Sequence, residues 1–278
     1  MLHFPKDCVV LRNTFEIMGP VYWIDIFSIS VLFGLTVIIA FGAIMLGQFF
    51  GTRMKALTSN KDSIGSVVGA TLGFLAFLLA FTFNMAANRF DDRKNLMVDE
   101  LNVIETTYRR AGLLLELNTT EIRALLQEYV DLRVSIARDP SKIDHAIIRS
   151  SEIQEQLWVE IENLSKEQPL GIKHSLYIQS LNQLIDLHEK RVTVGLHFRI
   201  PGAMWTGLYI LAVLAMIVVG YQFGQSKHRQ MLVSVILALA FSSVIALIAD
   251  LDRSSSGSIT VNQQPLFEFQ QKLKHYAE

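Results

Sequence analysis

Apolar and charged positions are arranged in blocks along the chain, and four blocks contain no Asp, Glu, Lys or Arg. These uncharged segments cover residues 26–52, 63–88, 200–226 and 230–249. A helix of about 20 apolar residues crosses roughly 30 Å of hydrocarbon. Because hydrocarbon offers no water to backbone N–H and C=O groups, we predict that all four segments are transmembrane helices.

The segment between the second and third apolar blocks is polar but keeps the periodicity of helices. Apolar residues recur three or four positions apart over residues 122–136 and 143–164. Asp139, Pro140 and residues 168–171 interrupt this pattern, and such short breaks favour antiparallel neighbours. The sequence predicts an all-α protein with four transmembrane helices and an extramembrane antiparallel helical bundle between spans two and three.

This pattern divides the chain into five parts. They are an N-terminal interfacial segment (1–20), transmembrane helices one and two (21–88), the extramembrane helical domain (89–199), transmembrane helices three and four (200–250) and a C-terminal tail (251–278). The lipid bilayer is therefore the first predicted partner.

Composition excludes several classes of function. Hydrophobic residues make up 51% of the chain, and the net charge of −1 gives no overall field that would attract nucleic acid. The seven histidines and single cysteine are too scattered for a metal site, so no metal or cofactor is expected. No phosphate-binding loop or hydrolase motif occurs, and we predict that the protein is not an enzyme.

Basic residues in the two short loops predict the orientation. The loop between the first two spans contains Arg53, Lys55 and Lys61. The loop between the last two spans contains Lys227 and Arg229. Short loops rich in Lys and Arg face the cytoplasm. In a bacterial inner membrane, the helical domain and both termini would then be periplasmic.

Span two carries glycines at every fourth position, Gly65, Gly69 and Gly73. Small residues at this spacing allow helix backbones to approach closely. Two interpretations are equally open. The glycines could pack tightly within one subunit, or they could belong to a helix that lines the axis of a symmetric oligomer.

The same span carries Phe74, Phe77 and Phe81 on one face, with Asn84 one turn further on. A phenylalanine stripe usually meets lipid or a neighbouring helix. If it lines a pore instead, it forms an apolar neck that gates by dewetting. Asn84 is costly against lipid, which favours an internal partner or an aqueous lumen.

Charged residues gather where the spans meet the helical domain. They are Arg89, Asp91, Asp92, Arg93, Arg199, Asp250, Asp252 and Arg253. A collar of salt bridges within or between subunits is one interpretation. The other is a charged vestibule that selects inorganic ions.

Several short motifs, taken in order, resemble a bacterial bestrophin-like family of unknown function. They are residues 73–81 (GFLAFLLAF), 89–93 (RFDDR), 98–100 (VDE), 129–133 (YVDLR), 251–253 (LDR) and 264–266 (QPL). A proline commonly follows the Asp-Arg pair in that family, whereas Ser254 stands here. The resemblance covers about residues 59–274.

Bestrophins proper are pentameric anion channels with an apolar neck on their second span. The resemblance therefore implies a homo-oligomeric, anion-conducting channel, pentameric by analogy, with Phe74, Phe77 and Phe81 at the neck. Bestrophins place their helical domain in the cytoplasm, whereas the basic loops here favour the outside. The alternative function is a membrane sensor or scaffold whose helical domain binds a partner.

Overall fold

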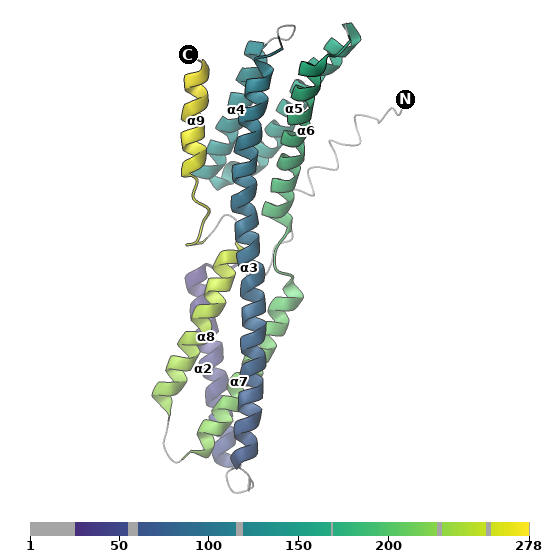
Figure 1. Cartoon of the computed structure of the whole chain (residues 1–278). Coiled ribbons are helices and arrows are strands. Elements are labelled where there is room, and N and C mark those ends of the chain that lie inside the picture. Colours follow the sequence, from purple (N-terminus) through teal and green to yellow (C-terminus); the bar gives the residue numbers. More distant parts are fainter. Residues whose placement is uncertain are drawn as a thin grey trace, which may run out of the picture. The chain divides into compact units, whose positions relative to one another are not determined.

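The computed structural model describes residues 26–54, 61–114, 119–167, 169–226, 230–253 and 257–277. Its helices are α2 (Ile29–Arg53), α3 (Lys61–Ala111), α4 (Thr119–Arg138), the 3-10 turn η2 (Pro140–Lys142), α5 (Ile143–Glu167), α6 (Ile172–Val192), the π-helical turn η3 (Thr193–His197), α7 (Gly202–Gln225), α8 (Met231–Asp252) and α9 (Gln264–Ala277) (Figure 1). The described residues contain no strand, which confirms the predicted all-α fold class.

Four helical stretches among the described residues are long and apolar enough to cross a membrane, as predicted. They are Ile29–Arg53, Ile64–Ala111, Ile172–Gln225 and Met231–Asp252. The second and third are much longer than a bilayer requires, so only their apolar parts can lie in hydrocarbon. The chain is thus a membrane protein with four spanning helices.

The described chain separates into two compact units. The apolar unit comprises residues 26–90 and 199–260, and the polar unit comprises residues 91–198 and 261–277. Helix α3 contributes residues to both. The predicted interfacial segment, residues 1–20, lies outside the described residues.

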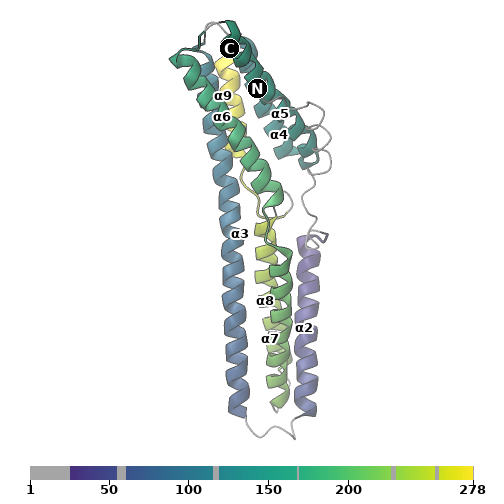
Figure 2. The same cartoon turned by 90° about the vertical axis from the view of Figure 1, so that its right-hand side faces the viewer.

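In the apolar unit, α2 packs along α7 and α8, and Figure 2 shows α3 on the other side of these two helices. Gly47 and Gly51 of α2 face Gly220 and Gly224 of α7. A Cβ atom at Gly220 would lie 2.8 Å from the carbonyl carbon of Ile44, and one at Gly224 would lie 2.9 Å from the Cα of Gly51. Glycine therefore permits this close crossing. We did not predict it, although both pairs have the four-residue spacing.

Side-chain caps explain two of the helix boundaries. Asp139 accepts the Ser141 N–H at 3.1 Å, and Pro140 occupies the first turn of η2, where its missing N–H has no cost. This is the break predicted at these residues. Ser28 accepts the Val31 N–H at 3.4 Å and so caps the start of α2.

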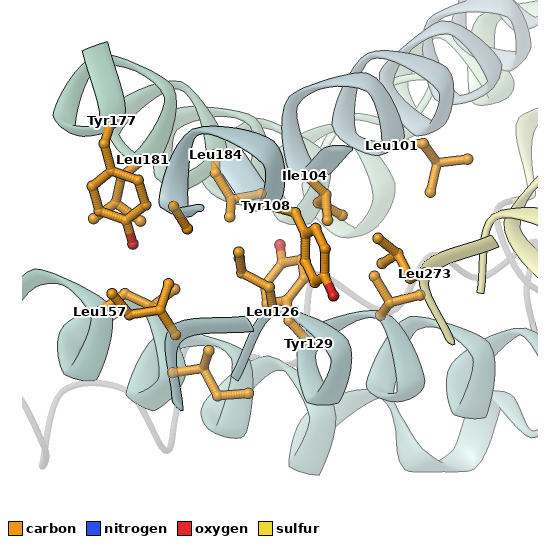
Figure 3. Close-up of a cluster of buried hydrophobic side chains, with 14 of the residues drawn as sticks. Leu101, Ile104, Tyr108, Leu126, Tyr129, Leu157, Tyr177, Leu181, Leu184 and Leu273 are labelled. Carbon is orange, nitrogen blue, oxygen red and sulfur yellow. The ribbon is translucent and has the colours of Figure 1, made fainter. Parts of the chain in front are cut away.

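The polar unit has its own hydrophobic core, built by α3, α4, α5, α6 and α9 (Figure 3). Its labelled members are Leu101, Ile104, Tyr108, Leu126, Tyr129, Leu157, Tyr177, Leu181, Leu184 and Leu273. Helix α9 buries Leu266, Phe269 and Leu273 in this core, and its Lys272 pairs with Glu105 at 2.7 Å. The C-terminal helix is therefore an integral part of this unit.

Candidate functional site

One face of α3 in the apolar unit is not covered by the rest of the described chain. Only 11% of the most apolar part of this span is buried, against 28%, 33% and 39% for the other three spans. The exposed residues between positions 66 and 88 are Ser66, Val67, Gly69, Ala70, Gly73, Phe74, Ala76, Phe77, Ala80, Phe81, Phe83, Asn84 and Asn88. Small residues, phenylalanines and asparagines dominate this face, which we call the open face of α3.

The opposite side of α3 is packed. Val68, Leu75, Thr82 and Ala86 are buried at spacings of seven, seven and four residues, as expected for one helix face. Leu75 and Ala86 belong to the core of the apolar unit. The Thr82 hydroxyl donates to the Leu78 carbonyl at 2.7 Å, which satisfies its polar group. The rest of the apolar unit therefore packs against one side of α3.

The predicted neck residues all lie on the open face. Phe74, Phe77 and Phe81 are 59%, 65% and 50% exposed, and Asn84 is exposed as well. Large apolar rings and a side-chain amide therefore share this face within three turns of helix.

The three glycines of span two, Gly65, Gly69 and Gly73, also have few or no neighbours in the described chain. A Cβ atom at Gly69 or Gly73 would meet nothing within 4 Å in the described chain, and one at Gly65 would meet only the Gln222 amide, at 3.8 Å. In the described residues, tight glycine packing occurs instead between α2 and α7. No helix among the described residues fills the space beside Gly69 and Gly73.

The exposed faces of α2 and α8 have a different composition. Their large exposed residues are Val31, Leu35, Ile38, Ile39, Leu46, Phe49 and Phe50 on α2, and Met231, Leu232, Val233, Val235, Ile236, Leu239, Val244 and Leu247 on α8. Such continuous surfaces of large apolar side chains suit lipid, whereas small residues are typical of helix–helix contacts. The open face of α3 therefore differs in composition from the exposed faces of α2 and α8.

The charged residues near the membrane segments separate into buried and exposed groups. Asp252 is buried. Its carboxylate accepts one hydrogen bond from the Arg199 side chain at 3.1 Å and another from the Ile200 N–H at 3.0 Å. This is a salt bridge within one subunit, which was one of the two predicted arrangements. Arg89 and Arg93 are half-buried, whereas Asp91 and Asp92 are exposed.

Asp250 and Arg253 are also buried and hold loop backbone. Asp250 accepts the N–H groups of Ser258 at 2.8 Å and Ile259 at 3.1 Å. Arg253 donates to the Phe27 carbonyl at 2.6 Å. A vestibule role for these residues remains a prediction, while these contacts give both of them a structural role.

A second polar cluster lies inside the polar unit and centres on Glu100, which is fully buried. The Tyr129 hydroxyl donates to its carboxylate at 2.6 Å, Arg133 pairs with it at 3.2 Å, and Arg191 forms a further ion pair. Arg133 also donates to the Tyr129 oxygen at 2.7 Å and to Nδ1 of His188. The cluster ties α3, α4 and α6 together.

The surroundings fix the charges in this cluster. Burial would raise the pKa of the Glu100 carboxyl, but Arg133, Arg191 and the Tyr129 hydrogen bond outweigh it and lower the pKa to about 2. Burial and the positive charge of Arg133 lower the pKa of His188 to about 3. At neutral pH the cluster therefore contains an ionised glutamate and an uncharged histidine.

No group of His, Cys, Asp and Glu side chains among the described residues is arranged to hold a metal ion. The geometry thus offers two distinct features. One is an open, partly polar helix face in the apolar unit, and the other is a buried ionic cluster in the polar unit.

The chain as a whole belongs to a known class of membrane protein. The model of the bestrophin-like domain matches residues 34–266, so the chain belongs to the bestrophin-like family. This confirms the resemblance in the sequence. Known members of the family are ion channels rather than enzymes. No functionally curated protein matches the chain.

Solved structures agree with this assignment. A bacterial bestrophin homologue from Klebsiella pneumoniae, phased with zinc, superposes with a TM-score of 0.62 at 18% identity, covering 90% of this chain and 97% of that one. A mutant of the Klebsiella pneumoniae homologue gives 0.64 at 16% identity, covering 87% and 96%. A crystal structure described as a mutant membrane protein gives 0.63 at 18% identity, covering 90% and 97%. At these identities the likeness concerns the fold.

Proposed function

We propose that the protein is a homo-oligomeric ion channel in which the open face of α3 lines the pore. The observation that carries this proposal is the composition of that face. Exposed glycines and an exposed asparagine accompany the phenylalanines within a segment of bilayer length. A single copy surrounded by lipid would leave the Asn84 amide in hydrocarbon, which is costly. Assembly around the face removes this cost, because the amide then meets water or another copy.

Phe74, Phe77 and Phe81 form the neck in this proposal. Their rings project from one side of α3 and are half or more exposed in the single chain. Brought together around an axis, they would make an apolar constriction that resists wetting. Asn84, one turn beyond Phe81, offers a polar group to ions that leave the constriction.

Anion conduction is the selectivity that the family resemblance supports. Asp250 and Asp252, which would favour cations at a channel mouth, are buried and engaged with backbone and Arg199. Asp91 and Asp92 remain exposed. The sign of selectivity therefore depends on whether these two carboxylates face the permeation path, and chloride and potassium fluxes must be measured separately.

The proposed location is the bacterial inner membrane, with the polar unit outside the bilayer as an antiparallel helical bundle. The basic residues Arg53, Lys55, Lys61, Lys227 and Arg229 support cytoplasmic short loops. The polar unit and both termini would then be periplasmic. Lipid, inorganic ions and further copies of the chain, five by family resemblance, are the proposed partners, and nucleic acid is not among them.

The test is ion flux into liposomes that contain the purified protein. The Phe74→Ala/Phe77→Ala/Phe81→Ala variant should widen the constriction and raise flux severalfold. Phe49→Ala is the matched control, because Phe49 is a phenylalanine that is 52% exposed on the apolar outer face of α2. It should leave flux unchanged. If neither the natural protein nor the triple variant conducts while the oligomer stays intact, the channel is refuted and the sensor or scaffold alternative replaces it.

A further inference from the structure

We propose that the conduction path continues beyond the neck along a line of side-chain oxygens on α3, and that this line makes the channel prefer cations. It consists of asparagine and aspartate residues on the exposed side of the helix, namely Asn84, Asn88, Asp91, Asn95, Asp99 and Asn102. We call it the oxygen stripe. The inference rests on the proposed channel, and it replaces the anion preference of the family resemblance with one that follows from this chain's own residues.

The spacing of the six residues places them on one face of α3. They are separated by four, three, four, four and three positions, and α3 runs without a break from Lys61 to Ala111. Because successive residues turn by about 100°, the six side chains fall within a sector about 80° wide. The same sector contains Phe77 and Phe81. The oxygen stripe therefore continues the face that carries the neck, over about 27 Å of helix.

Positive charge is kept out of this sector. Three basic residues lie on α3 between the neck and the end of the stripe, and all of them point at least about 60° outside the sector. They are Arg89, Arg93 and Lys94. The next charged residue within the sector is Arg109, whose charge is paired with Glu105 at 2.8 Å. The unpaired charge along the stripe is therefore negative, and Asp91 and Asp99 supply it.

Exposure to solvent alone does not explain this choice of residues. All six are exposed, and none of their side chains forms a hydrogen bond or an ion pair with another described residue. Asparagine and aspartate are poor helix formers, whereas Glu, Gln and Lys are good ones. The exposed positions of α5 use the good helix formers Glu152, Glu155, Gln156, Glu162 and Lys166. A line of six poor helix formers indicates that the side-chain oxygens themselves are required.

The chemistry of the oxygen stripe suits cations in transit. Amide and carboxylate oxygens are the ligands that hard cations prefer. An amide can also donate to an anion, so the two carboxylates decide the sign of selectivity, as carboxylate rings do in cation channels. The oxygens are spread along the helix, and among the described residues no group is arranged to hold a metal ion. Several weak sites of this kind allow hydrated monovalent cations to move on, which conduction requires.

Reversal potentials in planar bilayers test the selectivity of the purified full-length protein under a potassium chloride gradient. The natural protein should pass potassium in preference to chloride, and Asp91→Asn/Asp99→Asn should lower the permeability ratio severalfold. Asp144→Asn/Glu155→Gln is the matched control, because it removes two exposed carboxylates from α5. It should leave the ratio unchanged. A chloride preference in the natural protein, or equal shifts in both variants, overturns the inference and leaves the channel standing. A protein without any conductance refutes the channel and this inference together.

Cysteine modification provides a second measurement at neighbouring positions of the same helix. Asn95 belongs to the oxygen stripe, whereas Lys94 is equally exposed and points about 100° away. In a Cys8→Ser background, a thiol reagent that adds a positive charge should lower potassium flux into liposomes severalfold for Asn95→Cys. The same reagent should leave the flux of Lys94→Cys unchanged. Equal inhibition at the two positions would contradict a path along the stripe.

Discussion

Replacing Glu100 with glutamine should destabilise the polar unit strongly, even though the two side chains have nearly the same shape. The carboxylate is fully buried and is the counter-charge of Arg133, which is only 7% exposed, and of Arg191. Glutamine keeps an acceptor for the Tyr129 hydroxyl but removes the negative charge. Arg133 is then left as an uncompensated positive charge in a buried site, and the partly exposed Arg191 loses its partner.

The expected magnitude follows from that unpaired charge. Removing one partner of a buried ion pair costs about 3–5 kcal/mol. Proteins of this size lose roughly 2–4 °C in melting temperature for each kcal/mol. Glu100→Gln should therefore lower the melting temperature of the purified protein in detergent by roughly 10 °C, measured by circular dichroism at a fixed protein concentration.

Glu105→Gln is the matched control, because Glu105 lies on the same helix and also pairs with two basic residues. Its partners, Lys272 and Arg109, have side chains that are 46% and 61% exposed. Exposed pairs contribute at most about 1 kcal/mol. If both variants melt at the same temperature, burial of the Glu100 cluster does not have the energetic effect assigned to it. Adding Arg133→Met to Glu100→Gln should recover part of the loss, because the excess charge is then removed.

Three further predictions concern pH, packing and orientation. Folding lowers the pKa of the buried histidine from 6.5 to about 3 and that of the buried glutamate from 4.5 to about 2. The unfolded chain therefore binds more protons, and the melting temperature should fall as the pH drops below about 6.5; a flat profile down to pH about 4 would exclude a neutral buried histidine. Gly220→Ala should lower the melting temperature because its Cβ would collide with α2, whereas Gly34→Ala, with nothing within 4 Å, should not; equal effects would contradict the close crossing. Single cysteines at Thr58 and Ser226 in a Cys8→Ser background should resist an impermeant thiol reagent in intact cells, and one at Ser141 should react; the reverse pattern would invert the orientation.

Local sequence was sufficient to predict the spans and several helix ends. Whether a segment can lie in hydrocarbon depends on its own length and charge, and all four predicted spans are present among the described helices. The break at Asp139 and Pro140 was predictable for the same reason, since a cap and a proline act on adjacent backbone. The bestrophin-like motifs identified the family because their order and spacing survive in the chain.

The partners of the glycines depended on tertiary structure. Gly69 and Gly73 have the same four-residue spacing as Gly47 and Gly51, so their sequence patterns are equivalent. Only packing shows that the α2 glycines meet the backbone of α7 while the α3 glycines face open space. A residue's own chemistry does not specify which distant helix lies against it, because that depends on how every helix buries its preferred face.

The charged residues at the ends of the spans show the same difference between what the sequence predicts and what the tertiary structure decides. Their positions in the sequence put Asp250, Asp252 and Arg253 directly after a span. Either a vestibule or a salt-bridge collar was possible there. The structure buries all three and provides their hydrogen-bond partners. Sequence thus determined which segments can enter the membrane, because hydrophobicity is a local property. Tertiary structure decided which polar groups are paired and which helix face remains open, because both depend on contacts between residues far apart in the chain.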